Sequence, residues 1–244
     1  MSGTLVVNEI YLSLQGESTF AGLPCIFIRL TACHLRCSYC DTAYAFTEGR
    51  KTRLSDVQRK VLELARPFSG IVSTQRLPLV ELTGGEPLLQ KNSLPLMTWL
   101  CDQGFTVLIE TSGALDISSV DSRVHRIMDL KCPSSGESER NRWDNLKHLK
   151  RTDEMKFVIG TQQDYEWAKL QLREHQLAAV CPILFSWVAP LQPHQQDKTL
   201  KKIPEGQTAL SRRELVEKII ADALPVRFQL QMHKFIWPPD ERGV

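Results

Sequence analysis

Three cysteines stand within eight residues in the first part of the chain, where Cys33, Cys37 and Cys40 form the pattern C-x3-C-x2-C. Thiolates are soft ligands that suit iron–sulfur clusters or zinc. A four-iron cluster normally takes four cysteine ligands, so a local set of three leaves one iron without a protein ligand. Because an open coordination position on a metal is a place for chemistry, the spacing favours a catalytic cluster.

Two other interpretations of these cysteines stay open from the residues alone. A structural zinc site needs four ligands, and neither His34 inside the loop nor the distant Cys132 completes a familiar zinc pattern. The cysteines could also be buried without any metal. A loop that contains Arg36 and His34 is a poor apolar site for that, so we favour the metal interpretation.

A glycine pair follows the short apolar run 79–82, in the segment 83–87 (Thr-Gly-Gly-Glu-Pro). Two glycines let the backbone approach a ligand closely. An ordinary turn after a strand is the alternative. The three-cysteine loop upstream favours the ligand-binding interpretation of this segment.

Arg29 is a charged residue in the otherwise apolar run 25–30. Burial of an unpaired charge is costly, so Arg29 needs an anionic partner. A guanidinium binds carboxylates in a bidentate fashion. The partner is therefore either the carboxylate of a ligand or a carboxylate of the protein in a structural ion pair.

The composition narrows the class of protein. The chain has 244 residues with 30 Lys and Arg, 28 Asp and Glu, and a net charge of +2, which is not the footprint of a dedicated nucleic-acid binder. We interpret Lys198, Lys201 and Lys202 as solvated surface. Seven cysteines, three of them clustered, do not form a secreted disulfide framework. No signal peptide and no apolar run of roughly 20 residues stands out, so we expect a cytoplasmic protein.

Apolar runs typical of strands alternate with helical patterns from residue 79 onward, which predicts a parallel sheet with right-handed crossovers. Ser55 and Ser211 are expected to cap helices. Ligands of such folds bind at the carboxyl ends of the strands, so the polar loops should converge on one face. We expect one domain over 1–244, with an irregular excursion at 192–209 and a short tail at 238–244. The expected strands are 5–13, 25–30, 79–82, 105–109, 126–130, 155–159, 183–188 and 227–231.

The cysteine pattern together with the later Gly-Gly-Glu resembles the radical S-adenosylmethionine (SAM) superfamily. Within it, the segments 14–17 (Leu-Gln-Gly-Glu), 40–42 (Cys-Asp-Thr) and 231–234 (Gln-Met-His-Lys), with Arg29, resemble the 7-carboxy-7-deazaguanine synthase family. The resemblance extends from about residue 8 to residue 237. It implies an α/β fold, a single-domain incomplete (β/α)6 TIM-type barrel with about six parallel strands.

The resemblance also implies the reaction. The family is a carbon–nitrogen lyase that converts 6-carboxy-5,6,7,8-tetrahydropterin to 7-carboxy-7-deazaguanine with loss of ammonia, in queuosine and deazapurine biosynthesis. A 5′-deoxyadenosyl radical abstracts hydrogen from C6 of the pterin, and SAM is regenerated. The implied cofactors are a [4Fe-4S] cluster, SAM and Mg²⁺. The implied partners are the pterin, an electron donor such as flavodoxin or ferredoxin, and a second copy in a homodimer, with no nucleic acid and no membrane.

The resemblance also implies roles for individual residues at matching positions. It implies no catalytic side chain, because the SAM-derived radical carries out the chemistry. Cys132 is not expected to be a fourth cluster ligand, because it would close the open iron. The cluster ligands would be Cys33, Cys37 and Cys40, and the magnesium ligand Thr42. SAM would be bound by Tyr39, Cys40, Asp41, Gly84, Gly85, Glu86, Ser112, Cys132, Pro133, Ser134 and Gln192. The pterin would be bound by Leu14, Gln15, Gly16, Glu17, Arg29, Thr83 and His233.

Two other functions remain as alternatives. A radical SAM activase of a partner protein often has an additional cluster region, whereas this chain has no second cysteine cluster. A zinc-stabilised binding module is the alternative from a different class of protein. The metal content of the purified protein separates these classes, because the synthase and the activase would both contain iron whereas the binding module would contain zinc.

Overall fold

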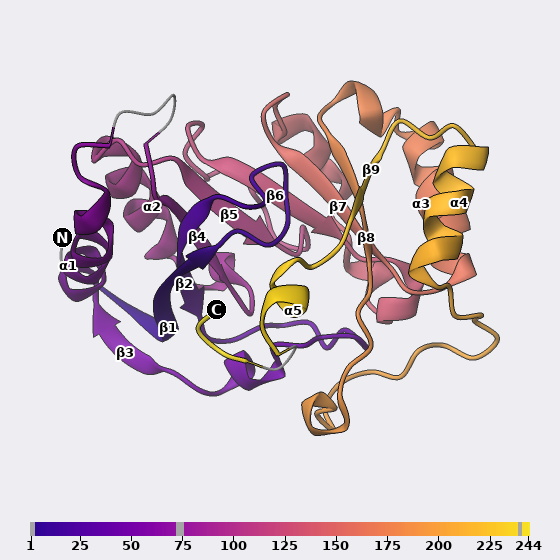
Figure 1. The fold of residues 1–244 in the computed structure, drawn as a ribbon, viewed down its shortest axis with the longest axis horizontal. Coiled ribbons are helices and arrows are strands. Elements are labelled where there is room, and N and C mark those ends of the chain that lie inside the picture. Colours follow the sequence, from indigo (N-terminus) through magenta and orange to yellow (C-terminus); the bar gives the residue numbers. More distant parts are fainter. Residues whose placement is uncertain (1–2, 72–75, 239–240) are drawn as a thin grey trace.

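The chain folds around one nine-stranded sheet with the strand order β3-β1-β2-β4-β5-β6-β7-β8-β9. The computed structural model describes residues 3–71, 76–238 and 241–244. β2 and β4 to β9 are parallel, whereas β1 and β3 pair in antiparallel fashion at one edge, so the sheet is open (Figure 1). The strands are β1 Thr4–Leu14, β2 Pro24–Leu30, β3 Arg50–Arg53, β4 Leu79–Gly84, β5 Val107–Thr111, β6 His125–Leu130, β7 Glu154–Ile159, β8 Ile183–Trp187 and β9 Arg227–Gln229.

The long helices flank the sheet, and a short one lies near its middle. In Figure 1, α1 and α2 lie beside the first strands of the parallel series and α3 and α4 beside the last ones, whereas α5 lies centrally, close to the C-terminus. The helices are α1 Leu54–Ala65, α2 Ser93–Asp102, α3 Gln162–Glu174, α4 Arg212–Ala221 and α5 His233–Ile236.

The two faces of the sheet differ in polarity because successive side chains of a strand point to opposite faces. In β2, Ile26, Ile28 and Leu30 belong to the main hydrophobic core. The alternate residues of the same strand, Phe27 and Arg29, line a pocket. The same alternation in the other parallel strands gives the sheet one apolar face and one mixed face, which carries the polar pocket residues and a smaller hydrophobic cluster of Cys25, Phe27, Leu79, Leu108 and Ile127.

The parallel α/β fold that the sequence predicts is confirmed, with two differences. The parallel part has seven strands, rather than about six, because β9 extends the series. In addition, the crossovers at 112–124 and 131–153 contain no α-helix among their residues, all of which are described, although 3-10 turns occur in the second. Both segments are rich in Ser, Asp and Asn, whose side chains compete with helical hydrogen bonds.

One predicted helix cap is confirmed and the other is wrong. Ser211 caps α4, and its side chain accepts a hydrogen bond from the backbone N–H of Glu214. Ser55 does not cap α1, because that helix begins at Leu54, directly after β3, and has Arg53 at its N-cap. The strand at 50–53 leads straight into the helix and leaves no turn for Ser55 to close.

The excursion at 192–209 contains one 3-10 turn, Pro193–Gln195, and is otherwise irregular up to Ala209, which forms an isolated β-bridge with Thr161. It differs from a freely solvated segment at Lys201, whose ammonium pairs with Glu137 at 2.9 Å. In the tail 238–244, residues 239 and 240 lie outside the described part of the chain. None of the described helices is long and apolar enough to cross a lipid bilayer.

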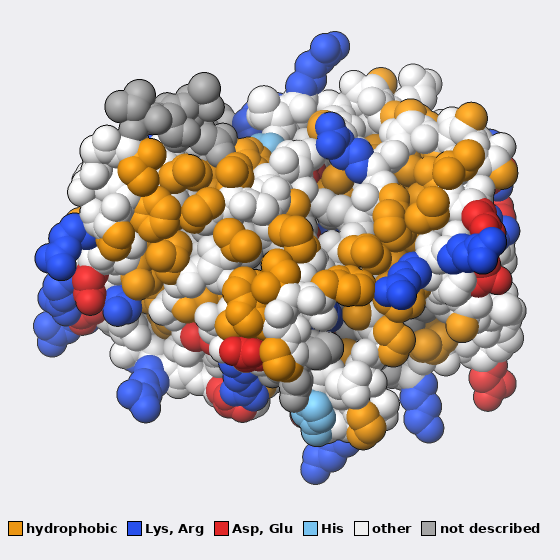
Figure 2. Space-filling view, in the orientation of Figure 1, with side chains coloured by type: hydrophobic (Ala, Val, Ile, Leu, Met, Phe, Trp, Pro, Cys, Tyr) orange, Lys and Arg blue, Asp and Glu red, His pale blue; other side chains and the backbone are white. Residues whose placement is uncertain are grey.

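Charged side chains gather along the rim of the face seen in Figure 2, whereas hydrophobic side chains cover much of its centre. The central helix α5 contributes Phe235 and Ile236, which are 57% and 50% exposed. The centre of this face is therefore more apolar than its rim.

Candidate active site

A pocket of about 780 Å³ lies at the carboxyl ends of the parallel strands. It joins the cysteine loop, the segment after β1, the ends of β4 to β8 and the region of α5. Cys33, Cys37 and Cys40 all line it. This is the convergence of strand-end loops that a parallel sheet predicts.

The structure brings most of the predicted site residues into this one pocket. Every residue predicted to bind the pterin lines it, as do the candidate magnesium ligand and most of the candidate SAM residues. These lining residues are Leu14, Gln15, Gly16, Glu17, Arg29, Tyr39, Asp41, Thr42, Thr83, Gly84, Gly85, Ser112 and His233, together with the three cysteines. The predicted SAM residues outside the lining are Glu86, Cys132, Pro133, Ser134 and Gln192.

The glycine pair fixes the start of the cysteine loop. The backbone N–H of Gly85 donates to the Leu30 carbonyl at 3.0 Å, and that of Glu86 donates to the Ala32 carbonyl at 2.8 Å. A Cβ on Gly84 or on Gly85 would stand only 2.1 Å from one of these two carbonyl oxygens. Side chains at 84 and 85 are therefore excluded by backbone that cannot move cheaply.

The other side of the cysteine loop rests on the segment after β6. Ser38 donates through its hydroxyl to the Ser134 carbonyl at 2.6 Å and through its N–H to the Ser135 carbonyl at 3.0 Å. The Arg36 N–H donates to the buried Glu137 carboxylate at 2.7 Å. Glu137 also binds Lys201, so the excursion helps to hold the loop.

The thiols are protonated in the metal-free protein. Burial raises the pKa of Cys37 to about 12, and it also raises the pKa values of Cys33 and Cys40. In residues 3–71, 76–238 and 241–244, no three His, Cys, Asp or Glu side chains are placed to hold a single metal ion. A four-iron cluster is larger than one ion, so its ligands need not converge on one point.

Unpaired polar atoms accompany the cysteines. The Tyr39 hydroxyl, the Asp129 Oδ1 and the Ser134 hydroxyl are buried without a hydrogen-bond partner. Native proteins leave few such atoms unsatisfied. Three soft ligands suit a cluster, and the unsatisfied polar groups beside them suit a polar ligand bound next to that cluster. A closed zinc site would need a fourth ligand, so it fits these residues less well.

Glu86 is buried beneath the pocket rather than in its wall. Its carboxylate accepts from the Ser112 N–H at 2.8 Å, the Ser112 hydroxyl at 2.6 Å and the Thr111 hydroxyl at 2.9 and 3.0 Å. It also accepts from the Leu88 N–H at 3.1 Å. These donors already occupy both oxygens, so Glu86 holds the end of β5 against the glycine segment.

The other predicted SAM residues outside the pocket have identifiable surroundings. Cys132 is fully buried in the hydrophobic core, and Pro133 and Ser134 belong to the 3-10 turn Pro133–Ser135 that supports Ser38. Gln192 is exposed at the start of the excursion and hydrogen-bonds with Gln195. Here these four residues shape the surroundings of the pocket without lining it.

Arg29 has a carboxylate of the protein as its partner. Its Nε donates to Glu9 at 2.7 Å, and Nη2 donates to the Tyr11 hydroxyl at 2.9 Å. Glu9 stands opposite Arg29 in the β1–β2 register. A guanidinium has five N–H groups, so these two bonds leave three for a ligand in the pocket.

The segment after β1 reaches the floor of the pocket through Gln15 and Glu17. The Gln15 amide donates to the buried Glu81 carboxylate and accepts from the Glu17 N–H at 2.7 Å. Glu17 accepts from Gln231 at 3.0 Å and from Lys156 at 3.1 Å. Burial raises the pKa of Glu17, but the charges of Lys156 and His233 and the hydrogen bonds from Gln231 and Lys156 together outweigh burial and lower this pKa.

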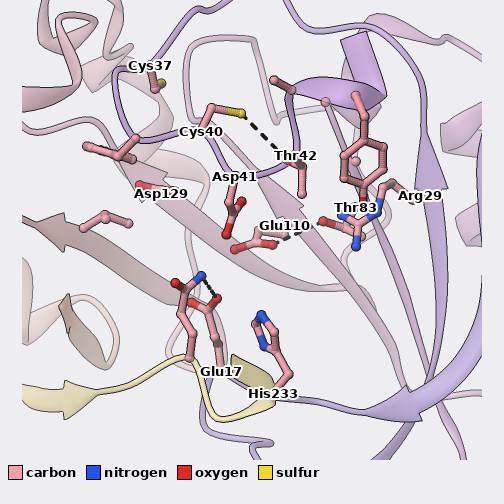
Figure 3. A pocket seen from close by; sticks show the side chains of 18 of the residues that line it. Glu17, Arg29, Cys37, Cys40, Asp41, Thr42, Thr83, Glu110, Asp129 and His233 are labelled. Atoms are coloured by element: carbon pink, nitrogen blue, oxygen red, sulfur yellow. Dashed lines mark hydrogen bonds between the residues drawn. The ribbon is translucent and has the colours of Figure 1, made fainter. Parts of the chain in front are cut away.

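The residues after Cys40 face the same space (Figure 3). The Cys40 thiol and the Thr42 hydroxyl are 3.8 Å apart. Asp41 pairs with Lys234. Burial raises the pKa of Asp41, but Lys234 outweighs it and brings this pKa down to about 2. The ion pair ties the cysteine loop to α5.

His233 closes the pocket opposite the cysteine loop. A Cβ on Gly16 would meet its Nδ1 at 2.5 Å, so Gly16 allows the imidazole to pack directly on the backbone. Burial lowers the pKa of His233. In Figure 3, Glu17 and His233 point across the pocket toward Asp41 and Glu110.

Sequence reasoning missed several charged residues of the pocket. Glu81, Glu110, Asp129, Lys131 and Lys156 all line it. Their signal is the one that identified Arg29, a charge in or directly after an apolar strand, as in Val-Glu-Leu at 80–82 and Met-Lys-Phe at 155–157. The signal does not find pocket residues alone, because Arg126 in β6 and Glu154 in β7 are charged strand residues outside the lining.

The fold and this pocket define an enzyme built on an open parallel α/β sheet, with a three-cysteine loop at the strand ends. No general protein-family model matches the chain. The 7-carboxy-7-deazaguanine synthase of Koribacter versatilis is 42% identical over 98% of this chain and 99% of its own length. That of Chlorobaculum tepidum is 41% identical over 98% and 97%.

Solved structures agree on the fold. The crystal structure of QueE from Escherichia coli matches with a TM-score of 0.65 at 23% identity, and covers 94% of this chain and 95% of that one. Streptococcus suis SuiB bound to S-adenosylmethionine matches with a TM-score of 0.55 at 15% identity over 82% of this chain and 48% of that one. The chain belongs to the 7-carboxy-7-deazaguanine synthase family, which decides against the activase and the zinc-stabilised module.

Proposed function

We propose that the chain converts 6-carboxy-5,6,7,8-tetrahydropterin to 7-carboxy-7-deazaguanine with loss of ammonia, in the biosynthesis of queuosine and related deazapurines. The observation that carries the proposal is one pocket that joins the three cysteines to the segment 14–17 and to Arg29. Relatives that bear the name of this activity match nearly the whole chain.

The cysteine loop would hold the cofactors. We assign a [4Fe-4S] cluster to Cys33, Cys37 and Cys40, and SAM to the adjacent space beside Tyr39, Ser112 and the glycine pair. When bound, a reduced cluster and SAM together supply the radical that takes hydrogen from the substrate. The chain would contribute the thiolates and the walls that exclude water. Because Gly84 and Gly85 have no side chains, SAM can approach the backbone there.

The opposite wall would bind the pterin. Gln15, Glu17 and the backbone of residues 14 and 16 offer acceptors and donors for the amide and amine groups of the ring. Thr83 and His233 complete this side. The three N–H groups of Arg29 that are not engaged by Glu9 and Tyr11 would bind the substrate carboxylate.

Thr42 would supply an oxygen ligand to Mg²⁺. This ion prefers hard oxygen ligands and usually keeps several waters. The Thr42 hydroxyl lines the pocket and makes no side-chain cap bond with the 3-10 turn Ala43–Phe46 that follows it. Asp41 is already committed to Lys234, so we assign Asp41 to the fixation of the loop.

The remaining proposals concern partners and setting. We infer that residues 1–244 act as one domain, that the enzyme is a cytoplasmic homodimer without nucleic-acid or membrane partners, and that a flavodoxin or ferredoxin supplies its electron. Participation of all nine strands in one sheet supports the single domain. The apolar surface of α5 supports a second copy as partner, and sedimentation of the purified enzyme tests the dimer.

Metal content tests the proposed cofactor. The anaerobically reconstituted chain should hold about four irons and cleave SAM when reduced. Stoichiometric zinc without iron would refute the proposal. Incubation with the carboxylated pterin then tests the substrate.

A further inference from the structure

Lys156 is a buried lysine on β7 to which the proposed chemistry gives no task. Its side chain is 5% exposed and lies on the pocket face of the sheet. The ammonium donates to Glu17 at 3.1 Å and to Glu110. Burial of an ammonium costs several kcal/mol unless charged partners compensate, so these two carboxylates are what permits the lysine here.

The pair of carboxylates comes from opposite sides of the pocket. Glu17 follows β1 and Glu110 lies in β5, so Lys156 links the wall that would bind the pterin to the sheet beneath it. Among the described residues, each carboxylate has one further side-chain donor, Gln231 at 3.0 Å for Glu17 and Thr83 at 3.2 Å for Glu110. A carboxylate has about four lone-pair sites, so both retain acceptor capacity toward the pocket.

Lys156 is the cation that pairs with both Glu17 and Glu110 at the floor of the pocket. Glu81 lies beside the pair, and among the described residues it has no ion-pair partner and only Gln15 as a side-chain hydrogen-bond partner. Burial raises the pKa of Glu81 well above its ordinary value. The neighbouring Asp129 is paired with Lys131 at 2.8 Å. Without Lys156, Glu17 and Glu110 would lose the ion pairs that offset their burial and hold their carboxylates in place.

We propose that Lys156 is a positioning residue for the substrate, because it fixes the carboxylates of Glu17 and Glu110 as acceptors for the N–H groups along one edge of the heterocycle. The inference rests on the proposed function and names the chemistry of one side of its substrate. That side is an amidine-like edge, with an amino group next to a ring N–H. Lys156 acts through Glu17 and Glu110 and need not touch the substrate.

The test is pterin binding by the cluster-loaded enzyme with SAM and without reductant, measured by calorimetry. We expect Lys156→Met and Glu17→Gln each to weaken the Kd about 10- to 100-fold, the range of one charged hydrogen bond. The double variant should bind about as weakly as the weaker single variant, because both changes remove one interaction. Lys169→Met is the matched control, since Lys169 also bridges two carboxylates, Glu166 and Asp222, but outside the pocket.

Wild-type affinity in Lys156→Met would overturn the inference, and so would losses that multiply in the double variant. If Lys156→Met does not retain its iron, Glu17→Gln and Glu110→Gln are measured instead, and wild-type affinity in both variants overturns the inference. Failure of the wild type to bind the pterin would overturn the proposed function as well. Wild-type binding with no effect at Lys156 would overturn this inference alone.

Discussion

Replacement of Glu86 by Ala separates a structural role from direct contact with SAM. The carboxylate accepts from four donor groups of Leu88, Thr111 and Ser112, and the side chain is 0% exposed. A buried donor left without a partner costs about 1–3 kcal/mol. We take the low end for each, because water can enter the space left behind, and expect a loss of about 4 kcal/mol. Domains are stable by only about 5–15 kcal/mol, so the effect is large.

The assay is urea unfolding of the iron-loaded protein under anaerobic conditions, with SAM binding measured separately on the folded fraction. The unfolding midpoint should fall strongly in Glu86→Ala and less in Glu86→Gln, which keeps one carbonyl oxygen. The exposed Glu139 is the control, and Glu139→Ala should change stability by no more than about 0.5 kcal/mol. If Glu86→Ala unfolds like the wild type and yet fails to bind SAM, Glu86 contacts SAM directly and our reasoning is wrong.

Four further predictions concern the pocket. Arg29→Met should reduce pterin turnover at least tenfold, about the loss of one charged hydrogen bond, and spare slow uncoupled SAM cleavage; equal loss of both rates would make Arg29 purely structural. Thr42→Val should abolish the response of turnover to added Mg²⁺ in a magnesium titration, and an unchanged response would exclude Thr42 as a ligand. Gly85→Ala places a methyl group 2.1 Å from a carbonyl oxygen of the cysteine loop, so iron content after reconstitution should fall by half or more; full iron content would show that the loop can shift. Lys156 contributes to the lowered pKa of Glu17 in the folded protein. Pterin binding that depends on ionised Glu17 is therefore fully present above the ordinary pKa of about 4.3. This binding is lost only when the pH falls through the lower pKa that Glu17 has in the folded protein. Calorimetry should therefore give a constant ratio of wild-type to Glu17→Gln pterin affinity from about pH 8 to pH 5, and a decline of this ratio that begins above pH 6 would contradict the prediction.

The strands and the loops at their ends could be predicted because their signals are local. The apolar run 25–30 predicted a buried strand, and its charged Arg29 predicted an anionic partner, which is Glu9. The alternation of strands and helices predicted the parallel sheet, and parallel strands bring their carboxyl ends together. Gln15, Thr42 and His233 were assigned to one site by the family resemblance rather than by this reasoning, and the pocket contains all three.

The remaining features depend on contacts that sequence spacing does not encode. Glu86 belongs to a recognisable motif, but its burial depends on Thr111 and Ser112 of the next strand. Lys156 acquires its two partners only when β7 stands two strands from β5 in the folded sheet. Lys201 looked like solvated surface because its partner, Glu137, lies 64 residues away in the chain.

The central claim is that this pocket contracts a pterin ring. The most direct measurement is anaerobic incubation of the reconstituted enzyme with SAM, a reductant, Mg²⁺ and 6-carboxy-5,6,7,8-tetrahydropterin, followed by mass analysis. We predict 7-carboxy-7-deazaguanine and an equimolar amount of ammonia, with little net consumption of SAM. Steady cleavage of SAM with the pterin recovered unchanged would contradict the account.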